Sequence, residues 1–147
     1  MAGAAAKASA LGGYRLEDQV GFYLRRAAQR HAAIFAEHMT DALTPTQWAA
    51  LVKLAEFESL SQNLLGRETA MDGATIKGVV DRLLKRDFVA TAPDPDDARR
   101  MRVSITRAGL AAVAGGTGPA IAITAETLKP LDGAERRQLV ELLRRIG

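Results

Sequence analysis

The 147-residue sequence predicts a mainly helical fold with one small β-hairpin, and three observations support this prediction. Apolar residues recur every three or four positions along most of the chain, as in amphipathic helices. Capping residues at Thr44, Asp72 and Asp132 mark positions where helices begin. Two short segments, 88–91 and 101–105, alternate around a loop rich in proline and charge, which is typical of a hairpin.

The N-terminal part of the chain divides into a tail and a long helix. Residues 1–13 are mostly alanine and glycine, and we expect a flexible tail. Tyr14 to Asp41, within segment 14–42, is predicted to be one helix. Its buried stripe consists of Val20, Leu24, Ala27, His31, Ile34, Phe35 and His38. The two histidines lie seven residues apart and the chain has no cysteine, so we expect no metal site and interpret His38 as a packed, hydrogen-bonded residue.

A second helix is predicted after Thr44, where Thr44 and Gln47 form a capping box and Pro45 occupies the first turn. This helix should run to about Phe57. The side chains that it is expected to bury are Trp48, Leu51, Leu54 and Ala55. Glu58 to Leu60 would follow as a short strand beside the hairpin.

The region after Ser61 predicts two helices joined by a tight turn. The first runs from about Gln62 to Thr69, Met71 and Asp72 form the turn, and the second ends near Arg86. The second helix has one apolar face, made of Ile76, Val79, Val80, Leu83 and Leu84. On the opposite face, the side chains are small at the start of the helix and polar or basic afterwards. These residues are Gly73, Ala74, Thr75, Lys77, Gly78, Asp81 and Arg82. Such a face suits a helix whose N-terminal end enters the DNA major groove.

The hairpin loop, residues 93–100, contains two prolines that exclude regular ladder pairing. Arg99 and Arg100 at its tip could enter a minor groove, where the potential is most negative. Asp97 is placed to hydrogen-bond Arg99 and hold its guanidinium extended. Taken alone, a charged loop is equally well explained as a solvated turn. Directly after a helix-turn-helix, a DNA-binding wing is the better interpretation.

Two further helices are predicted at the C-terminus. Thr106 caps the first, which runs toward Leu128, and Gly115–Pro119 should kink or break it. Asp132 caps the last helix, whose apolar stripe consists of Leu139, Leu142, Leu143 and Ile146. The core of a small winged domain has no room for three extra amphipathic helices. A symmetric second subunit would cover their stripes, and we therefore expect a homodimer.

The stretch from Leu43 to Gly109 resembles the winged helix-turn-helix of the MarR family of bacterial transcriptional regulators. The motifs that carry the resemblance are LTPTQWAAL, LLGRETAMDGATIKGVVDRL, DPDDARR and ITRAG. The resemblance implies a DNA-binding domain at 43–109, dimerisation helices at 14–42 and 110–147, a palindromic double-stranded operator and a cytoplasmic location. It also adds Gln62 and Asn63 to the expected DNA contacts. Asp87 departs from the family, which usually has glycine there, and aspartate tolerates a positive φ better than most residues.

Family members place small aromatic or phenolic acids between the dimerisation helices and the winged domain. The segments around residues 14–51 and 61–83 most resemble a subgroup that represses nicotinic-acid catabolism and senses a hydroxylated nicotinate. The residues expected to hold such an acid are Tyr23, Arg26, Arg30, His31 and Trp48, because cationic groups bind a carboxylate and aromatic rings flank a flat ligand. Either arginine alone is better explained by a solvated helix face, and the alternative for His31 is a core histidine.

These observations predict a dimeric, ligand-responsive DNA-binding regulator, most simply a repressor. The formal net charge of +3 is compatible with nucleic acid without being diagnostic. An enzyme is the rival class, but the sequence has no Gly-x-Ser-x-Gly motif, paired-carboxylate motif or phosphate-binding loop, and we expect no cofactor. A winged-helix interaction protein that does not bind specific DNA is the other alternative. The chain has no apolar run long enough to predict a transmembrane helix.

Overall fold

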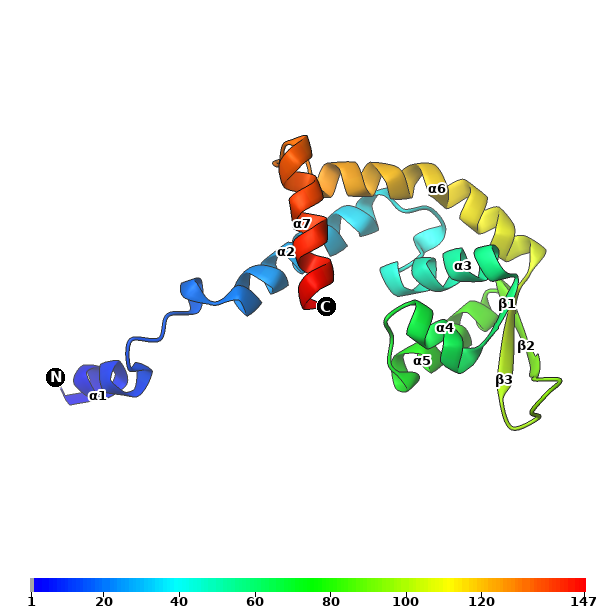
Figure 1. The fold of residues 1–147 in the computed structure, drawn as a ribbon, viewed down its shortest axis with the longest axis horizontal. Helices are drawn as coiled ribbons and strands as arrows, with labels where there is room; N and C mark the ends of the chain where they lie inside the picture. The colour runs from blue at the N-terminus through cyan, green and yellow to red at the C-terminus, as the bar shows by residue number, and fades with distance from the viewer. Residues whose placement is uncertain (1) are drawn as a thin grey trace.

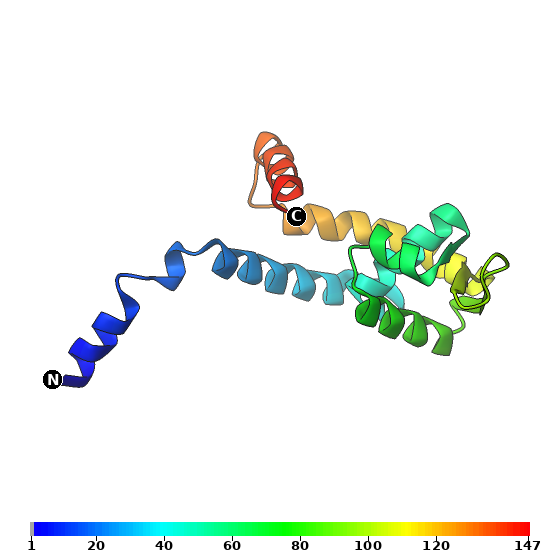
Figure 2. The same cartoon turned by 60° about the horizontal axis from the view of Figure 1, so that its bottom comes forward.

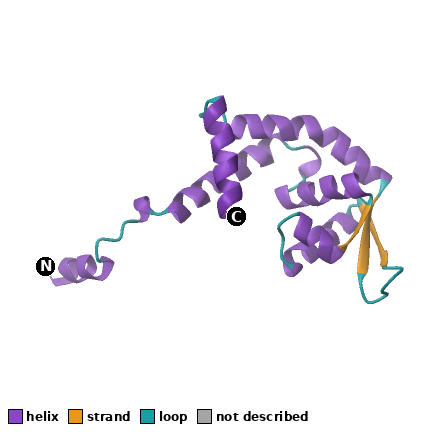
Figure 3. Ribbon diagram, viewed as in Figure 1, coloured by secondary structure: helices purple, strands orange, loops and turns teal. Residues whose placement is uncertain are grey.

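A computed structural model describes residues 2–147 and confirms a mainly helical fold with a small sheet (Figures 1 and 3). The elements in chain order are α1 (Ala2–Leu11), the 3-10 turn η1 (Leu16–Asp18), α2 (Val20–His38), the 3-10 turn η2 (Thr40–Ala42), α3 (Pro45–Phe57), β1 (Ser59–Ser61), α4 (Gln62–Glu68), α5 (Gly73–Lys85), β2 (Val89–Pro93), β3 (Met101–Ile105), α6 (Arg107–Thr127) and α7 (Gly133–Ile146).

The molecule has a globular winged unit and an elongated helical part. Helices α3, α4 and α5 and the sheet form the winged unit, whereas α2 and α6 extend from it side by side (Figures 1 and 2). Helix α7 lies near the far ends of α2 and α6, and α1 leads away from the rest of the chain (Figure 2). The elongated part therefore exposes much of its surface.

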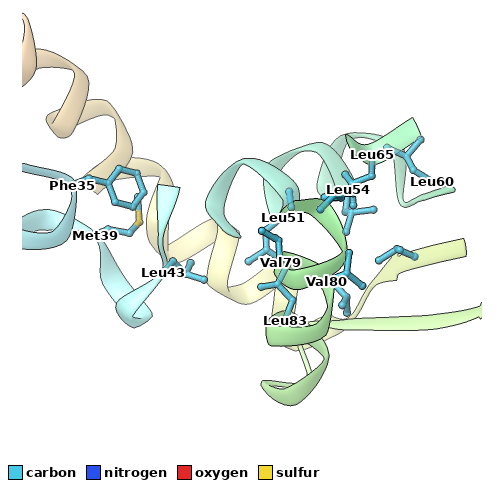
Figure 4. Packing of buried hydrophobic residues seen from close by; sticks show 14 of the residues in the cluster. Phe35, Met39, Leu43, Leu51, Leu54, Leu60, Leu65, Val79, Val80 and Leu83 are labelled. Atoms are coloured by element: carbon cyan, nitrogen blue, oxygen red, sulfur yellow. The ribbon is translucent and has the colours of Figure 1, made fainter. Parts of the chain in front are cut away.

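The core of the winged unit lies between α3, α5 and the sheet (Figure 4). Leu51 and Leu54 of α3 are fully buried, as the sequence predicted, whereas Trp48 is only partly buried. Four of the five apolar residues predicted on α5 are buried, namely Ile76, Val79, Val80 and Leu83, and Leu84 packs against them from a partly exposed position. The capping box of Thr44 and Gln47 is also confirmed.

The three strands form an antiparallel sheet in the order β1-β3-β2, which confirms the predicted strand before the helix pair. Leu60 of β1 and Thr91 of β2 both pair with Val103, which is fully buried. The prediction that Pro93 lies in the unpaired loop was wrong, because Pro93 pairs with Met101. It is the last residue of an edge strand, where proline is tolerated.

Helix α6 is continuous through Gly115–Pro119, so of the predicted kink or break, the break does not occur. An ideal Cβ at Gly116 would lie 2.4 Å from Cζ3 of Trp48, which shows that the helix packs closely on the indole there. This packing, together with the long contact with α2, offsets the low helix propensity of the glycines. Pro119 lacks the amide that would bond the Gly115 carbonyl, and the helix is curved rather than broken (Figure 1).

The N-terminal prediction also needs correction, because residues 2–11 of the expected tail form a helix. Alanine dominates this segment and is the strongest helix former. Gly12 and Gly13 then adopt positive φ values of 52° and 83°, and the first long helix begins at Val20 rather than Tyr14. It ends at His38, before η2.

Only part of the predicted stripe on α2 is buried within the chain. Ile34 and Phe35 are buried near the winged unit, whereas Val20 and Leu24 are 69% and 42% exposed. His38 is exposed, although its Nδ1 lies 2.9 Å from the carbonyl oxygen of Ile34. The stripe therefore has an uncovered half.

By length and composition alone, α6 could cross a membrane, although no membrane helix was expected from the sequence. Core helices of globular proteins have the same composition. Helix α6 packs on α2 and α3, and it buries Ala112, Gly116 and Ile123. Packing within the chain thus accounts for part of its apolar character, whereas other apolar residues, such as Leu110 and Ile121, remain exposed.

Candidate nucleic-acid interface and apolar pocket

The first turn of α5 is held by Asp72, as predicted. The Asp72 carboxylate accepts a 2.7 Å hydrogen bond from the backbone N–H of Thr75, and this bond lowers the pKa of Asp72. Gly73, Ala74 and Thr75 are exposed beyond the cap. The helix therefore presents small side chains and its own backbone at its N-terminal end.

The basic residues of α5 follow on the same exposed side. Lys77 is not free, because its Nζ lies 2.8 Å from Oδ2 of Asp81 in an exposed pair one turn along. Gly78 is partly buried under Arg82, whose Nη1 lies 3.4 Å from an ideal Cβ at position 78. The exposed Lys77–Asp81 ion pair is weak, so Lys77 can exchange it for a contact with a DNA phosphate.

The wing carries a hydrogen-bonded arginine at its tip, which confirms the prediction for Asp97 and Arg99. Oδ1 of Asp97 accepts bonds of 3.1 Å from both the backbone N–H and the Nε of Arg99. These bonds lower the pKa of Asp97, and Arg100 adds a 3.6 Å ion pair to the same carboxylate. The side chain of Arg99 nevertheless remains 91% exposed. The guanidinium is thus oriented without being covered.

The wing and α4 meet at a small cleft of about 200 Å³. Its lining includes Gln62 and Asn63 from the first turn of α4 and Arg99 and Arg100 from the wing. The structure therefore brings together residues that are nearly forty positions apart and that were all predicted to contact DNA.

A separate apolar pocket of about 520 Å³ lies between α2, the end of α6 and α7. It is lined by Val20, Tyr23, Leu24, Ala27, Ala28, His31, Thr127, Leu128, Leu139, Val140 and Leu143. Of the predicted ligand residues, only Tyr23 and His31 lie here. The Nδ1 of His31 is 2.9 Å from the Thr127 hydroxyl, so its polar edge is satisfied.

The other three predicted ligand residues are engaged elsewhere. Arg30 donates to the carbonyl oxygens of Thr127 and Glu126, at 2.6 and 3.0 Å, and so caps the C-terminal end of α6. The guanidinium of Arg26 lies 5.6 Å from the ring centroid of Phe22. Trp48 packs on Gly116 rather than facing His31. The sequence prediction did not include Thr127 or the residues of α7 that line the pocket. The apolar stripe containing Leu139 and Leu143 was the sequence signal that could have indicated the α7 side.

Within residues 2–147, no cluster of three or more His, Asp or Glu side chains is arranged to hold a metal ion. The described surface offers recognition by hydrogen bonds, charge and shape. The exposed end of α5 and the wing form one such surface, and the apolar pocket forms another.

Comparison with known proteins agrees with this geometry. The model of the MarR family matches residues 43–100. The HTH-type transcriptional repressor NicR of Pseudomonas putida is 38% identical over 134 residues, which cover 90% of this chain and 85% of NicR. The chain belongs to the MarR family. It is a MarR-family transcriptional regulator.

Two solved structures extend the match over the fold. The crystal structure of a probable transcriptional regulator from Pseudomonas aeruginosa is 52% identical, with a TM-score of 0.87 over 90% of this chain and 100% of that one. BpsR of Bordetella bronchiseptica is 40% identical, with a TM-score of 0.86 over 90% and 96%, and its DNA binding is regulated by 6-hydroxynicotinic acid. The predicted resemblance to the MarR family and its nicotinic-acid subgroup is thereby confirmed.

Proposed function

We propose that this MarR-family chain is a homodimeric cytoplasmic repressor that binds a palindromic operator and releases it when a small aromatic acid binds. The observation that carries the proposal is the presence of two distinct surfaces on one chain. The first is the exposed end of α5 with the wing arginines, and the second is the 520 Å³ pocket, whose volume suits a small ligand.

The DNA-facing half of the proposal rests on the placement of side chains. The small residues at the start of α5 let its backbone approach a major groove, and Thr75 can contact a thymine methyl group or a phosphate. Arg99 is exposed at the tip of a narrow hairpin and suits a minor groove. Gln62 and Asn63 line the cleft between α4 and the wing, where a phosphate backbone would pass.

The effector half rests on the composition of the pocket. Its walls are aliphatic apart from Tyr23, His31 and Thr127, which suits a flat ring with one or two polar substituents. His31 and Tyr23 are the side chains that would bind the carboxylate or ring hydroxyl. Because BpsR responds to 6-hydroxynicotinic acid, this acid is the first effector to test.

Dimerisation is supported by the apolar residues that the chain leaves uncovered. Leu142, Leu143 and Ile146 of α7 are 45%, 42% and 69% exposed, and Val20 and Leu24 of α2 are exposed as well. Apolar surface of this extent marks an interaction site. We expect analytical ultracentrifugation to show a dimer, and Leu142→Glu with Leu143→Glu to dissociate or unfold it. A wild-type monomer at micromolar concentration would contradict the proposal.

The function is tested by fluorescence anisotropy on a labelled duplex from the region upstream of the chain's own gene. We expect tighter binding to this duplex than to a random one of equal length, and release on addition of 6-hydroxynicotinic acid. 6-Hydroxynicotinamide, which keeps the hydroxylated ring and replaces the carboxylate by a carboxamide, is the matched control and should not release DNA. Equal binding to both duplexes would favour the alternative, an interaction protein without specific DNA binding.

A further inference from the structure

The C-terminal end of α5 is tied to the turn between α2 and α3. Arg86 caps this end of α5, and its Nη2 donates a hydrogen bond to the carbonyl oxygen of Asp41, in η2. The same guanidinium lies 4.6 Å from the ring centroid of Phe88, at the entry to β2. One side chain therefore contacts the helical scaffold, the recognition helix and the start of the wing.

The acceptor is held in place by an unusual turn. Asp41 and Ala42 both have positive φ values, 56° and 49°, in a region that residues with a Cβ occupy at an energetic cost. The backbone N–H of Leu43 donates to the carbonyl of Thr40 at 3.3 Å, and the turn packs on α6. The carbonyl of Asp41 is therefore fixed relative to α2 and α6.

The residues that follow the donor, Arg86, are also held in place. The hydroxyl of Thr106 donates a hydrogen bond to the carbonyl oxygen of Asp87 at 2.7 Å. The backbone N–H of Thr106 donates to the carbonyl oxygen of Phe88 at 3.1 Å. Between segment 20–42 and the helix pair 62–86, the described part of the chain contains only this one hydrogen bond, from Arg86 to Asp41. The helix pair otherwise packs on α3, which in turn packs on α6, and apolar packing of this kind has no direction of its own.

We propose that Arg86 is a positioning residue that sets the separation of the two recognition helices and thereby fixes the half-site spacing that the dimer accepts. The inference rests on the proposed dimeric operator binding. In such a dimer, the path from one α5 to the other runs through both scaffolds. A directional, charge-assisted bond at each junction resists sliding and rotation of α5, whereas apolar packing alone tolerates both.

The test uses palindromic duplexes built from a half-site selected in vitro by the wild-type protein from random DNA. One set keeps the selected spacing, and the others carry one base pair more or less at the centre. One inserted pair moves the half-sites by about 3.4 Å and rotates them by roughly 34°. We expect wild type to prefer the selected spacing by about tenfold or more, which is about 1.4 kcal/mol at 25 °C.

Arg86→Gln and Arg86→Met remove the charge and should reduce this preference to less than about threefold, since α5 can then adapt to either spacing. Arg86→Lys keeps a cationic donor and should retain part of the preference. Lys85→Gln is the matched control, because Lys85 is an exposed cation in the last turn of the same helix. It should keep the wild-type preference. Circular dichroism and thermal unfolding establish that each variant is folded.

Three outcomes would overturn the inference. A folded Arg86→Gln that discriminates between spacings as strongly as wild type shows that Arg86 does not set the separation. An equal loss of spacing preference in Lys85→Gln shows that the bond from Arg86 to Asp41 is not the cause of the preference. Unfolding of both Arg86→Gln and Arg86→Met makes Arg86 a residue of general stability. If wild type itself shows no spacing preference, the dimeric operator model fails, and that failure is seen before any variant is made.

Discussion

At the scale of single residues, Trp48 and Gly116 make a sterically demanding contact between α3 and α6. A Cβ at position 116 would lie within 2.4 Å of the indole, whereas one at Gly115 would meet no atom within 4 Å. Gly116→Ala should therefore lower the free energy of unfolding by about 1–3 kcal/mol, because the indole must move. Gly115→Ala should stabilise the chain by about 0.4–1 kcal/mol, since it only stiffens the unfolded chain. Urea unfolding of both variants tests this, and equal destabilisation would contradict it.

Arg99 carries a second prediction at this scale. Arg99→Ala should weaken binding to operator and to random duplex alike, because a minor-groove arginine contributes charge and shape recognition more than base-specific hydrogen bonds. The slope of the logarithm of the DNA-binding constant against the logarithm of salt concentration should decrease in magnitude by about 1. Lys129→Ala, which removes a positive charge at the other end of α6, should leave both affinities unchanged. An unchanged operator affinity in Arg99→Ala at moderate salt would exclude this role.

The residues that could be predicted from the sequence are those whose partners lie nearby in the chain. Asp72 and Thr75, or Asp97 and Arg99, are two or three positions apart, so local spacing determines their geometry. Arg30 could not be placed in this way, because its partners are the carbonyls at the end of α6, 96 and 97 residues later. A helical periodicity indicates which face a side chain lies on and does not indicate what covers that face.

At the scale of elements, the helix pair and β3 could be predicted almost to the residue, and side-chain caps mark where the helices begin. Strand β2 extends two residues beyond the predicted end, through Pro93. Helix α6 could not, since the glycines and Pro119 predict a kink or a break, and packing on α2, α3 and Trp48 keeps the helix continuous. Local propensity is a weak guide wherever a helix gains much of its stability from tertiary contacts. The ligand pocket depends on the relative placement of α2, α6 and α7, which sequence periodicity does not determine.

The cap of α5 gives the element-scale prediction. Hydrogen bonding lowers the pKa of Asp72, so its stabilising effect is present above the ordinary aspartate pKa of about 3.9 and is lost as pH falls through the lower folded value. Asp72→Asn keeps an acceptor for Thr75 and does not titrate. The stability difference between wild type and Asp72→Asn should therefore shrink as the solution is acidified. Urea unfolding at neutral and acid pH measures it, and parallel loss of stability in both proteins would contradict the assignment.

At the scale of the whole molecule, the apolar pocket lies on the scaffold and the recognition helix lies at the opposite end of α2. The Nδ1 of His31 contacts Thr127 at the end of α6, and η2, which follows α2, holds Arg86 of α5. A ligand that displaces the His31–Thr127 bond would act on both long helices of the scaffold. It can release DNA only by binding the non-binding arrangement more tightly, and a tenfold preference is worth about 1.4 kcal/mol.

The last prediction tests this coupling at the pocket. His31→Ala should bind operator as wild type does but should no longer release it with 6-hydroxynicotinic acid, because the ligand loses the cationic or hydrogen-bonding group in an otherwise aliphatic cavity. His38→Ala is the matched control, since His38 is exposed on the same helix and its Nδ1 lies within hydrogen-bond distance of the Ile34 carbonyl oxygen, one turn back. It should respond normally. Thermal unfolding supplies an independent measurement, because a ligand at 100 times its Kd stabilises the native state by about 2.7 kcal/mol. This stabilisation should occur in wild type and His38→Ala and should be absent in His31→Ala. Release by His31→Ala at the wild-type ligand concentration would place the effector elsewhere and leave His31 as a residue that only holds the end of α6.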